Sequence, residues 1–236
     1  MRKSILFLLI SGAICPVFAQ LGYFSVGYNG NIFKSEKLDF VIDRYNETRA
    51  YLDKTMDYPH YIDGLDLHFG GGSKVIFDIG YAWRGAEVSA SGIDASGINQ
   101  QRDLKYKFGV WNFALAYNFL NSTDFMLALG YNQTLGSEKI ETRVGPAADI
   151  ENENYTDIIK SFSPAAEFFI QVGVPLTERA GLLIKPYYHL NLVETDYGDV
   201  NRAINPATAA ADDFELLSAP GGFGISIMAA FGRFGN

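Results

Sequence analysis

Seven ionisable side chains stand at positions where small or polar residues alternate with bulky apolar ones. They are Asp66, His68, Asp78, Arg84, Glu167, Lys185 and His189. A histidine beside a carboxylate can act as a general acid–base pair, and charges inside a narrow protein can line an ion path. The same side chains can instead neutralise one another, because an unpaired buried charge costs several kcal/mol.

The spacing of these residues favours pairing over catalysis. A short turn at 177–180 should bring Glu167 next to His189 and Gln171 near Lys185. His60 is the third histidine, and no serine recurs with any histidine at a spacing that predicts catalytic groups within ~3 Å of each other. The sequence has no phosphate-binding glycine loop, zinc-ligand spacing or nucleophile elbow, so we expect neither a cofactor nor a metal. The predicted interior polar network consists of Asp78, Arg84, Glu167, Gln171, Lys185 and His189.

The segments that carry these residues alternate with a period of two, which is typical of β-strands with two different faces. In one segment Phe125, Leu127 and Leu129 share a face, while Ala128 and Asn132 lie on the other. A soluble barrel keeps its apolar face inside. Here the small and charged face must be the interior, which is the pattern of a membrane-spanning barrel.

Eight such segments are present, and the connections between them support one arrangement. The strands are expected at 21–33, 64–72, 75–92, 102–120, 125–145, 157–176, 181–197 and 213–234. Short links at 73–74, 121–124 and 177–180 alternate with long links at 34–63, 93–101, 146–156 and 198–212. The sequence therefore predicts an all-β, antiparallel up-and-down transmembrane barrel, with short turns in the periplasm and long loops outside.

Two features fit this pattern poorly. Pro164, Pro186 and Pro220 fall inside predicted strands, although proline normally occupies strand edges or bulges. In the segment 102–120 the apolar positions change phase between Val110 and Trp111, which predicts a β-bulge near Gly109. An error of two in the strand count would be in keeping with these features.

With these strands in place, the chain resembles the eight-stranded outer-membrane barrels of the OmpA-transmembrane and OmpX type. The resemblance covers nearly all of residues 20–236 and rests on architecture. The closing segment GGFGISIMAAFGRF is similar to the strand by which such barrels engage the barrel-assembly machinery, and Phe231 is the aromatic residue expected in that role. The chain departs from the family by ending Phe234-Gly235-Asn236 instead of on an aromatic residue.

The N-terminus predicts export. Residues 1–19, MRKSILFLLISGAICPVFA, have a basic start, an apolar run and small residues before a cleavage site after Ala19, as in a secretory signal peptide. The domain that remains, 20–236, is the predicted barrel. A net charge of −8 and a pI near 4.9 argue against nucleic-acid binding.

The first long link carries an amphipathic pattern. Leu38, Val41, Ile42, Tyr45, Leu52 and Met56 recur at helical spacing over 36–56, with Ser35 as the N-cap. This helix is expected to lie across the barrel mouth, and a docking surface is the alternative. The later long links are rich in carboxylates, which could hold Ca²⁺ or bridge to lipopolysaccharide through divalent cations. No EF-hand spacing and no His/Cys cluster supports a dedicated site, so these links predict a solvated acidic rim.

These observations lead to one predicted function with two alternatives. We expect a monomeric bacterial outer-membrane protein with a structural or surface-interaction role and no wide pore. Its partners would be outer-membrane lipid and lipopolysaccharide, the barrel-assembly machinery and an extracellular protein bound through the loops. The alternatives are an outer-membrane lipid-modifying enzyme and a soluble exported ligand-binding barrel.

Overall fold

The computed structural model describes residues 22–121, 125–209 and 215–232, and these form a closed antiparallel barrel of eight strands. The barrel strands are β1 (Tyr23–Ile32), β3 (Tyr61–Gly71), β4 (Val75–Ile93), β5 (Asn99–Asn121), β6 (Met126–Pro146), β7 (Thr156–Thr177), β8 (Ala180–Asn191) and β11 (Gly221–Gly232). Each strand pairs with its sequence neighbour in the barrel, and β1 pairs with both β3 and β11 to close the wall. The predicted fold class and strand number are confirmed. In the described ranges no helix is long and apolar enough to span a membrane.

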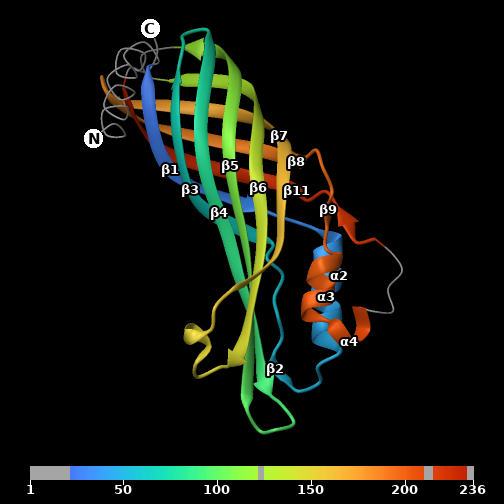
Figure 1. Ribbon diagram of the computed structural model, residues 1–236. Helices are drawn as coiled ribbons and strands as arrows, with labels where there is room; N and C mark the ends of the chain where they lie inside the picture. The colour runs from blue at the N-terminus through green and yellow to red at the C-terminus, as the bar shows by residue number, and fades with distance from the viewer. Residues whose placement is uncertain (1–21, 122–124, 210–214, 233–236) are drawn as a thin grey trace, which may run out of the picture.

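The connections alternate in length as predicted. The links from β3 to β4 and from β7 to β8 are tight, and residues 22 and 232 lie at the same end of the barrel as these turns (Figure 1). The backbone N–H of Gly232 donates to the carbonyl of Arg179 in the second of these turns. The signal peptide predicted at 1–19, most of the short link at 121–124 and the last four residues lie outside the described ranges.

The strands fall into two length classes. β4, β5, β6 and β7 have 19, 23, 21 and 22 residues, whereas the other four have 10 to 12. The extra residues, about ten per strand, carry a four-stranded sheet roughly 30 Å beyond the barrel. We call this extension and the elements packed on it the head. Its other elements are α2 (Glu36–Glu47), β2 (Leu52–Lys54), η1 (Ile150–Asn152), β9 (Thr195–Asp196), α3 (Gly198–Ile204), α4 (Pro206–Ala209) and β10 (Leu217–Ser218).

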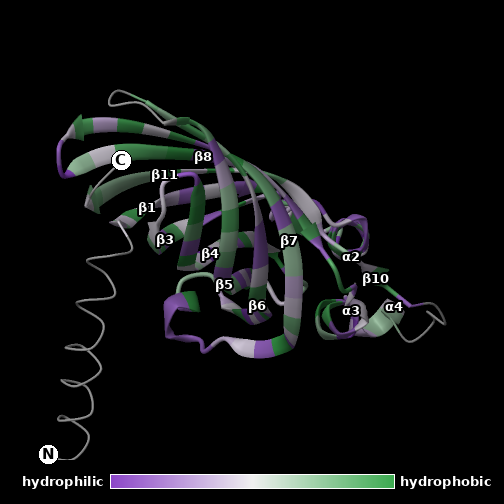
Figure 2. Cartoon of the chain, turned by 90° about the horizontal axis from the view of Figure 1, so that it is seen from above, coloured by the Kyte–Doolittle hydropathy of each residue, from purple (hydrophilic) through white to green (hydrophobic). Residues whose placement is uncertain are grey.

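The barrel exposes bulky apolar side chains on its outer face. Along β5 the outward residues Trp111, Phe113, Leu115 and Tyr117 are all exposed, while the inward residues Asn112, Ala114 and Ala116 are buried. Figure 2 shows the same alternation of hydrophobic and hydrophilic residues along the other strands. The exposed apolar belt of the barrel also includes Tyr28, Leu65, Phe77, Ile79, Leu129, Phe168, Ile170, Ile225 and Ile227. Such a belt requires an apolar solvent outside the barrel.

The β-bulge predicted near Gly109 is wrong. Gly109 pairs in unbroken register with Trp83 on one side and Ser137 on the other. The register shifts occur instead between Asn118 and Leu120, Ile140 and Glu141, and Pro175 and Thr177. The apolar side chains change faces at this point because the environment of the strand changes. Residues 99–108 of β5 lie in the head, where apolar side chains face inward, and the residues after Gly109 lie in the barrel, where they face outward.

The head has its own apolar core. Leu38, Val41, Ile42 and Tyr45 of α2 are buried in one cluster with Val200 and Ile204 of α3 and with Leu104, Tyr106, Ile140 and Ile159 of the extended sheet. Figure 1 shows the helices lying beside one face of that sheet. The apolar face of α2 is therefore occupied within the protein, which does not leave it free as a docking surface.

The predicted helix was too long. α2 begins after Ser35, whose Oγ accepts a hydrogen bond from the N–H of Leu38 (3.4 Å), and it ends at Glu47 instead of residue 56. Leu52 and Met56 fit the helical spacing, but Asn46 binds both backbone groups of Met56 and holds that segment extended. Residues 52–54 then form β2 along β4.

Two predicted strands were also too long. β8 ends at Asn191 instead of residue 197, and β11 begins at Gly221 instead of residue 213. The residues beyond each strand enter the head, where β9 and β10 pair only with each other. Pro186 does lie inside β8, opposite Ile225 of β11, and it is accommodated within the barrel wall.

The exposed belt predicts that an added charge destabilises the protein in the barrel but not in the head. Leu115 in the belt and Val144 in the head are each 49% exposed. Leu115→Arg should lower the free energy of unfolding by about 2–4 kcal/mol, because its guanidinium would face hydrocarbon. Val144→Arg is the matched control and should change it by less than about 0.5 kcal/mol. Urea unfolding in lipid vesicles measures both, and equal effects would argue against a lipid-facing belt.

Candidate functional site

One group of interior side chains surrounds the buried carboxylate of Glu167 on β7. Nδ1 of His189, directly opposite on β8, lies 3.0 Å from its Oε1, and Nη1 of Arg84 on β4 donates to the same oxygen at 3.4 Å. Nδ2 of Asn132 on β6 donates to Oε2 at 2.6 Å. Four strands thus converge on one buried carboxylate. The structure brings Glu167 and His189 together where the sequence placed them.

A second group surrounds Asp78, also on β4. Nδ1 of His68 on β3 lies 2.5 Å from its Oδ1, and the hydroxyl of Tyr23 on β1 donates to Oδ2 at 3.1 Å. Gln171 donates from Nε2 to that tyrosine hydroxyl at 3.4 Å, which links β7 to the same group.

Asp66 on β3 anchors a third group. It accepts hydrogen bonds from Nδ2 of Asn29 (3.0 Å) and from the hydroxyl of Ser226. The hydroxyl of Tyr187 on β8 donates to Oδ1 of Asn29 at 2.7 Å, and the Arg84 guanidinium lies 5.2 Å from the centre of that tyrosine ring. The three groups together reach around the wall from β1 to β11.

Lys185 reaches the interior without a carboxylate in hydrogen-bonding contact among the described residues. Its ammonium lies 4.2 Å from the centre of the Phe169 ring, a cation–π contact. This contact explains why Phe169, a bulky apolar residue, stands on the interior face of β7.

The side chains of this network nearly fill the lumen. The space that Asn29, Asp66, Arg84, Lys185 and Tyr187 help to line amounts to about 10 Å³. That volume is on the order of what a single water molecule needs, so this cavity has no room for a small-molecule ligand. Eight-stranded barrels are just wide enough for side chains to fill their interior.

Each of the three histidines has a partner within the protein. Nε2 of His189 lies 2.9 Å from Oδ1 of Asn191, so both of its ring nitrogens have partners inside the protein. His68 faces Asp78, and His60 in the head lies 2.9 Å from Asp39. Each histidine thus contacts a different carboxylate. These contacts neutralise charge and cross-link strands.

Sequence reasoning missed a buried carboxylate, Glu138, at the junction of barrel and head. Its two oxygens accept from the hydroxyls of Thr195 (2.7 Å) and Tyr197 (3.1 Å), which pins the β9–α3 segment to β6. Burial, and next the Glu138 carboxylate, raise the pKa of Tyr197 well above its usual value, so its hydroxyl stays a donor. The sequence contains the pattern that indicates this, because Glu138 follows Asn132 and Thr134 at even spacing and therefore faces the interior as they do.

The acidic residues of the long loops are partly neutralised. Asp157 pairs with Lys139 (2.7 Å), Glu151 with Arg143 (3.4 Å) and Asp199 with Arg202 (2.5 Å). Asp212 and Asp213 lie outside the described residues. Among the described residues, no three of His, Cys, Asp and Glu form a group that could hold a metal ion.

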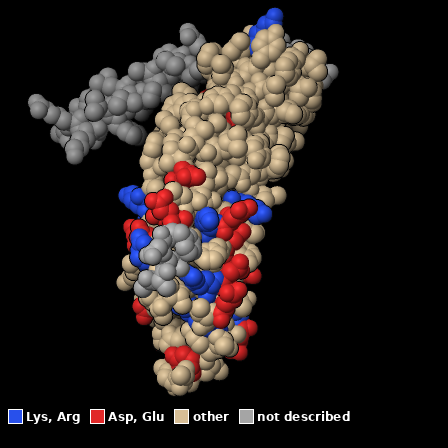
Figure 3. All heavy atoms as spheres, turned by 90° about the vertical axis from the view of Figure 1, so that its right-hand side faces the viewer, with Lys and Arg blue, Asp and Glu red and all other residues tan. Residues whose placement is uncertain are grey.

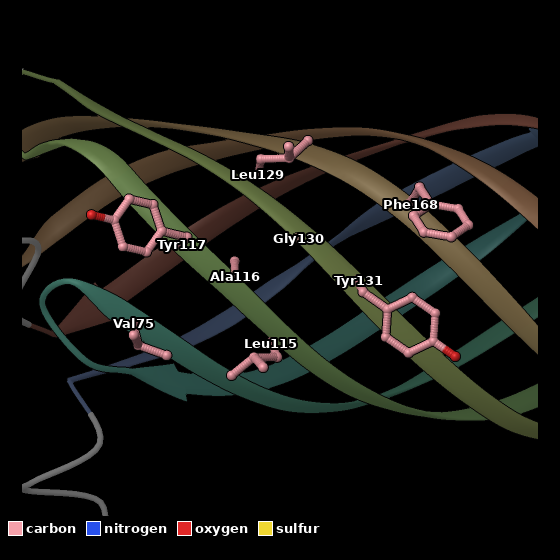
Figure 4. Close-up of a pocket in the computed structure, with 8 residues that line it drawn as sticks. All are labelled: Val75, Leu115, Ala116, Tyr117, Leu129, Gly130, Tyr131 and Phe168. Carbon is pink, nitrogen blue, oxygen red and sulfur yellow. The ribbon is translucent and has the colours of Figure 1, made fainter.

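Phe231 lies on the outer face of β11, half exposed, with Phe24 and Ala180 opposite it on the neighbouring strands. Another outward feature of the barrel wall is a groove of about 470 Å³ lined by Val75, Leu115, Ala116, Tyr117, Leu129, Gly130, Tyr131 and Phe168 (Figure 4). Its apolar lining fits acyl chains and belongs to the belt.

Eight antiparallel strands close around a polar lumen, inside an apolar outer wall. This is the architecture of a transmembrane β-barrel. No protein-family model matches the sequence, and no curated protein matches it. Two crystal structures of Ail, the attachment invasion locus protein of Yersinia pestis, are similar to this chain. The first is 10% identical, with a TM-score of 0.40, and the match covers 91% of this chain and 99% of Ail.

The second structure is Ail in complex with the heparin analogue sucrose octasulfate. It is 11% identical, with a TM-score of 0.38 and the same coverage of both chains. The assignment of the fold rests on the strand order and closure described above.

The network predicts a specific pattern of stability changes. Glu167→Leu should lower the free energy of unfolding in lipid vesicles by about 3–5 kcal/mol, because Arg84 and His189 would remain buried without their partner. The double variant Arg84→Met/Glu167→Leu should lose less than the single one, because both buried charges are removed. Glu194→Leu on the exposed surface is the control and should change little. A double variant that loses as much stability as Glu167→Leu alone, or more, would contradict this account.

Proposed function

We propose that this protein is a monomeric integral protein of the bacterial outer membrane. In this proposal the sealed barrel anchors an extracellular head with a structural or surface-interaction role, and the protein has no enzymatic activity. The observation that carries it is the division of the outer surface in Figure 3: the barrel presents few charged side chains, whereas the head carries many of both signs. Hydrocarbon outside the barrel and water outside the head account for this division.

The filled lumen supports an anchor more than a channel. Arg84, Glu167, Lys185 and His189 are all at most 6% exposed. The cavity that Arg84, Glu167 and Lys185 help to line measures only about 10 Å³. The same packing counts against a soluble ligand-binding barrel, which needs an apolar cavity instead of an apolar exterior.

The proposed partners follow from the parts of the surface. Outer-membrane lipid and lipopolysaccharide would contact the belt and the edge of the belt that borders the head. An extracellular protein would bind the head, whose far surface exposes Tyr51, Ile93, Ile98 and Val144. Phe231 on the closing strand is the proposed signal for the barrel-assembly machinery, and the export signal would be cleaved after Ala19.

A labelling experiment tests the orientation. The only cysteine of the chain is Cys15, within the predicted signal peptide, so single cysteines can be introduced into an otherwise cysteine-free mature chain. Ser96→Cys, exposed in the β4–β5 loop, should react with a membrane-impermeant maleimide on intact cells. Glu178→Cys, exposed in the β7–β8 turn, is the matched control and should react only after the outer membrane is opened.

The same samples should show a mobility shift between folded and boiled protein on a gel, as membrane barrels do. A soluble protein without that shift would refute the outer-membrane assignment. Labelling of Glu178→Cys on intact cells would reverse the proposed orientation.

A further inference from the structure

Where the barrel meets the head, the outward residues of β4 to β7 form level rows across four strands. The row at the rim of the belt is Trp83, Gly109, Ser137 and Phe162. The next row toward the head is Gly85, Lys107, Lys139 and Lys160, and the row after that is Glu87, Lys105, Glu141 and Asp157. The register thus places three lysines side by side directly above the belt.

The rim row has a notch in its middle. Trp83 and Phe162 are large and exposed, 49% and 65%, whereas Gly109 and Ser137 between them are small. The notch forms part of a surface cavity of about 440 Å³ that Trp83, Gly85, Lys107, Gly109, Ser137 and Lys139 help to line. A Cβ on Gly109 would lie 2.6 Å from the hydroxyl of Tyr81, so that hydroxyl sits over the glycine.

Lysines directly opposite one another across strands repel and destabilise a sheet. Two acids relieve this row from the side of the head: Glu141 contacts Lys107 and, at 2.5 Å, Lys139, and Asp157 lies 2.7 Å from Lys139. Lys160 has no carboxylate within 4.0 Å in the described part of the chain. Against Glu141 and Asp157, the three lysines keep one positive charge. Asp63 continues the row on β3, opposite Gly85, and also lines the cavity, but its carboxylate accepts a hydrogen bond from the Tyr28 hydroxyl, and Lys160 lies at the other end of the row.

We propose that this notch binds the phosphate group of a lipid headgroup in the outer leaflet. Lys107, Lys139 and Lys160 supply the positive charge, and the hydroxyls of Ser137 and Tyr81 supply hydrogen-bond donors. Trp83 and Phe162 flank the upper part of the lipid, as aromatic residues do at membrane interfaces. This inference rests on the proposed function, because it needs the belt to lie in a membrane.

The position of the notch selects a lipid over free phosphate. The row below it is Tyr81, Trp111, Leu135 and Pro164, all part of the apolar wall. A phosphate held under the lysines would place its acyl chains along this wall. A free phosphate ion would gain the charge of the lysines but would leave the apolar floor of the cavity uncovered.

The two tryptophans of the chain, Trp83 and Trp111, both lie here and provide a reporter. Trp111→Phe leaves Trp83 as the single tryptophan in the notch. In phosphatidylcholine nanodiscs, brominated phosphatidic acid should quench Trp83 more strongly than brominated phosphatidylcholine at the same mole fraction. Lys107→Gln/Lys139→Gln/Lys160→Gln in this background should reduce that preference about tenfold.

Two further variants distinguish binding in the notch from general electrostatic attraction between the protein and anionic lipid. Lys34→Gln/Lys37→Gln/Lys54→Gln removes the same charge elsewhere in the head and should keep the preference. Ser137→Leu fills the notch without changing charge and should weaken it. Equal quenching by both lipids in the wild-type notch, or an unchanged preference in the lysine-row variant, would overturn the proposal. Displacement by inorganic phosphate would overturn the choice of a lipid.

The folded-versus-boiled gel shift in phosphatidylcholine alone tells the two proposals apart. A protein that inserts but shows no lipid preference refutes only the notch. A protein that does not insert refutes the proposed function.

Discussion

Each of the four long strands passes from one solvent into another, and this constraint governs most of the molecule. In the barrel the outer face of β5 must be apolar, and Trp111, Phe113 and Leu115 meet that requirement. Beyond Gly109 the outer face carries Lys107 and Lys105, and the apolar residues Val110, Phe108 and Tyr106 turn inward. The strand itself continues without a bulge at this point. What changes is the face that carries the apolar side chains: the outer face in the barrel and the inner face in the head.

The inversion gives the two halves different interiors. In the head the inward residues are apolar, so they need a covering layer, which α2 and α3 provide. In the barrel the inward residues are small and polar, because a narrow closed wall leaves little volume and the bulky side chains already face outward. Charges in that lumen are tolerated because each main carboxylate has several donors: Glu167 has His189, Arg84 and Asn132. Glu138 joins the two interiors through Thr195 and Tyr197.

The sequence predicted most of what depends on local alternation. Strand number, closure, the alternation of turn lengths and the approach of Glu167 to His189 all follow from period two and one short turn. What it could not predict depends on tertiary contacts. Leu52 and Met56 continue the helical spacing of α2, but hydrogen bonds from Asn46 and pairing with β4 place them in an extended segment. The sequence does show that the apolar residues move to the other face of the strand at Gly109. A β-bulge and a passage from membrane to water produce the same local pattern, so the sequence alone does not distinguish them.

The most direct test is a nitroxide scan of the outward positions of β5, from Lys105 to Phe119, in the membrane-reconstituted protein. The solvent inversion predicts that Trp111, Phe113, Leu115, Tyr117 and Phe119 are accessible to oxygen dissolved in lipid. Lys105 and Lys107 should be accessible to a water-soluble relaxation agent, with the change at Gly109. Accessibility to the water-soluble agent at every outward position would contradict the account, as would a change of phase that leaves Lys107 in contact with lipid.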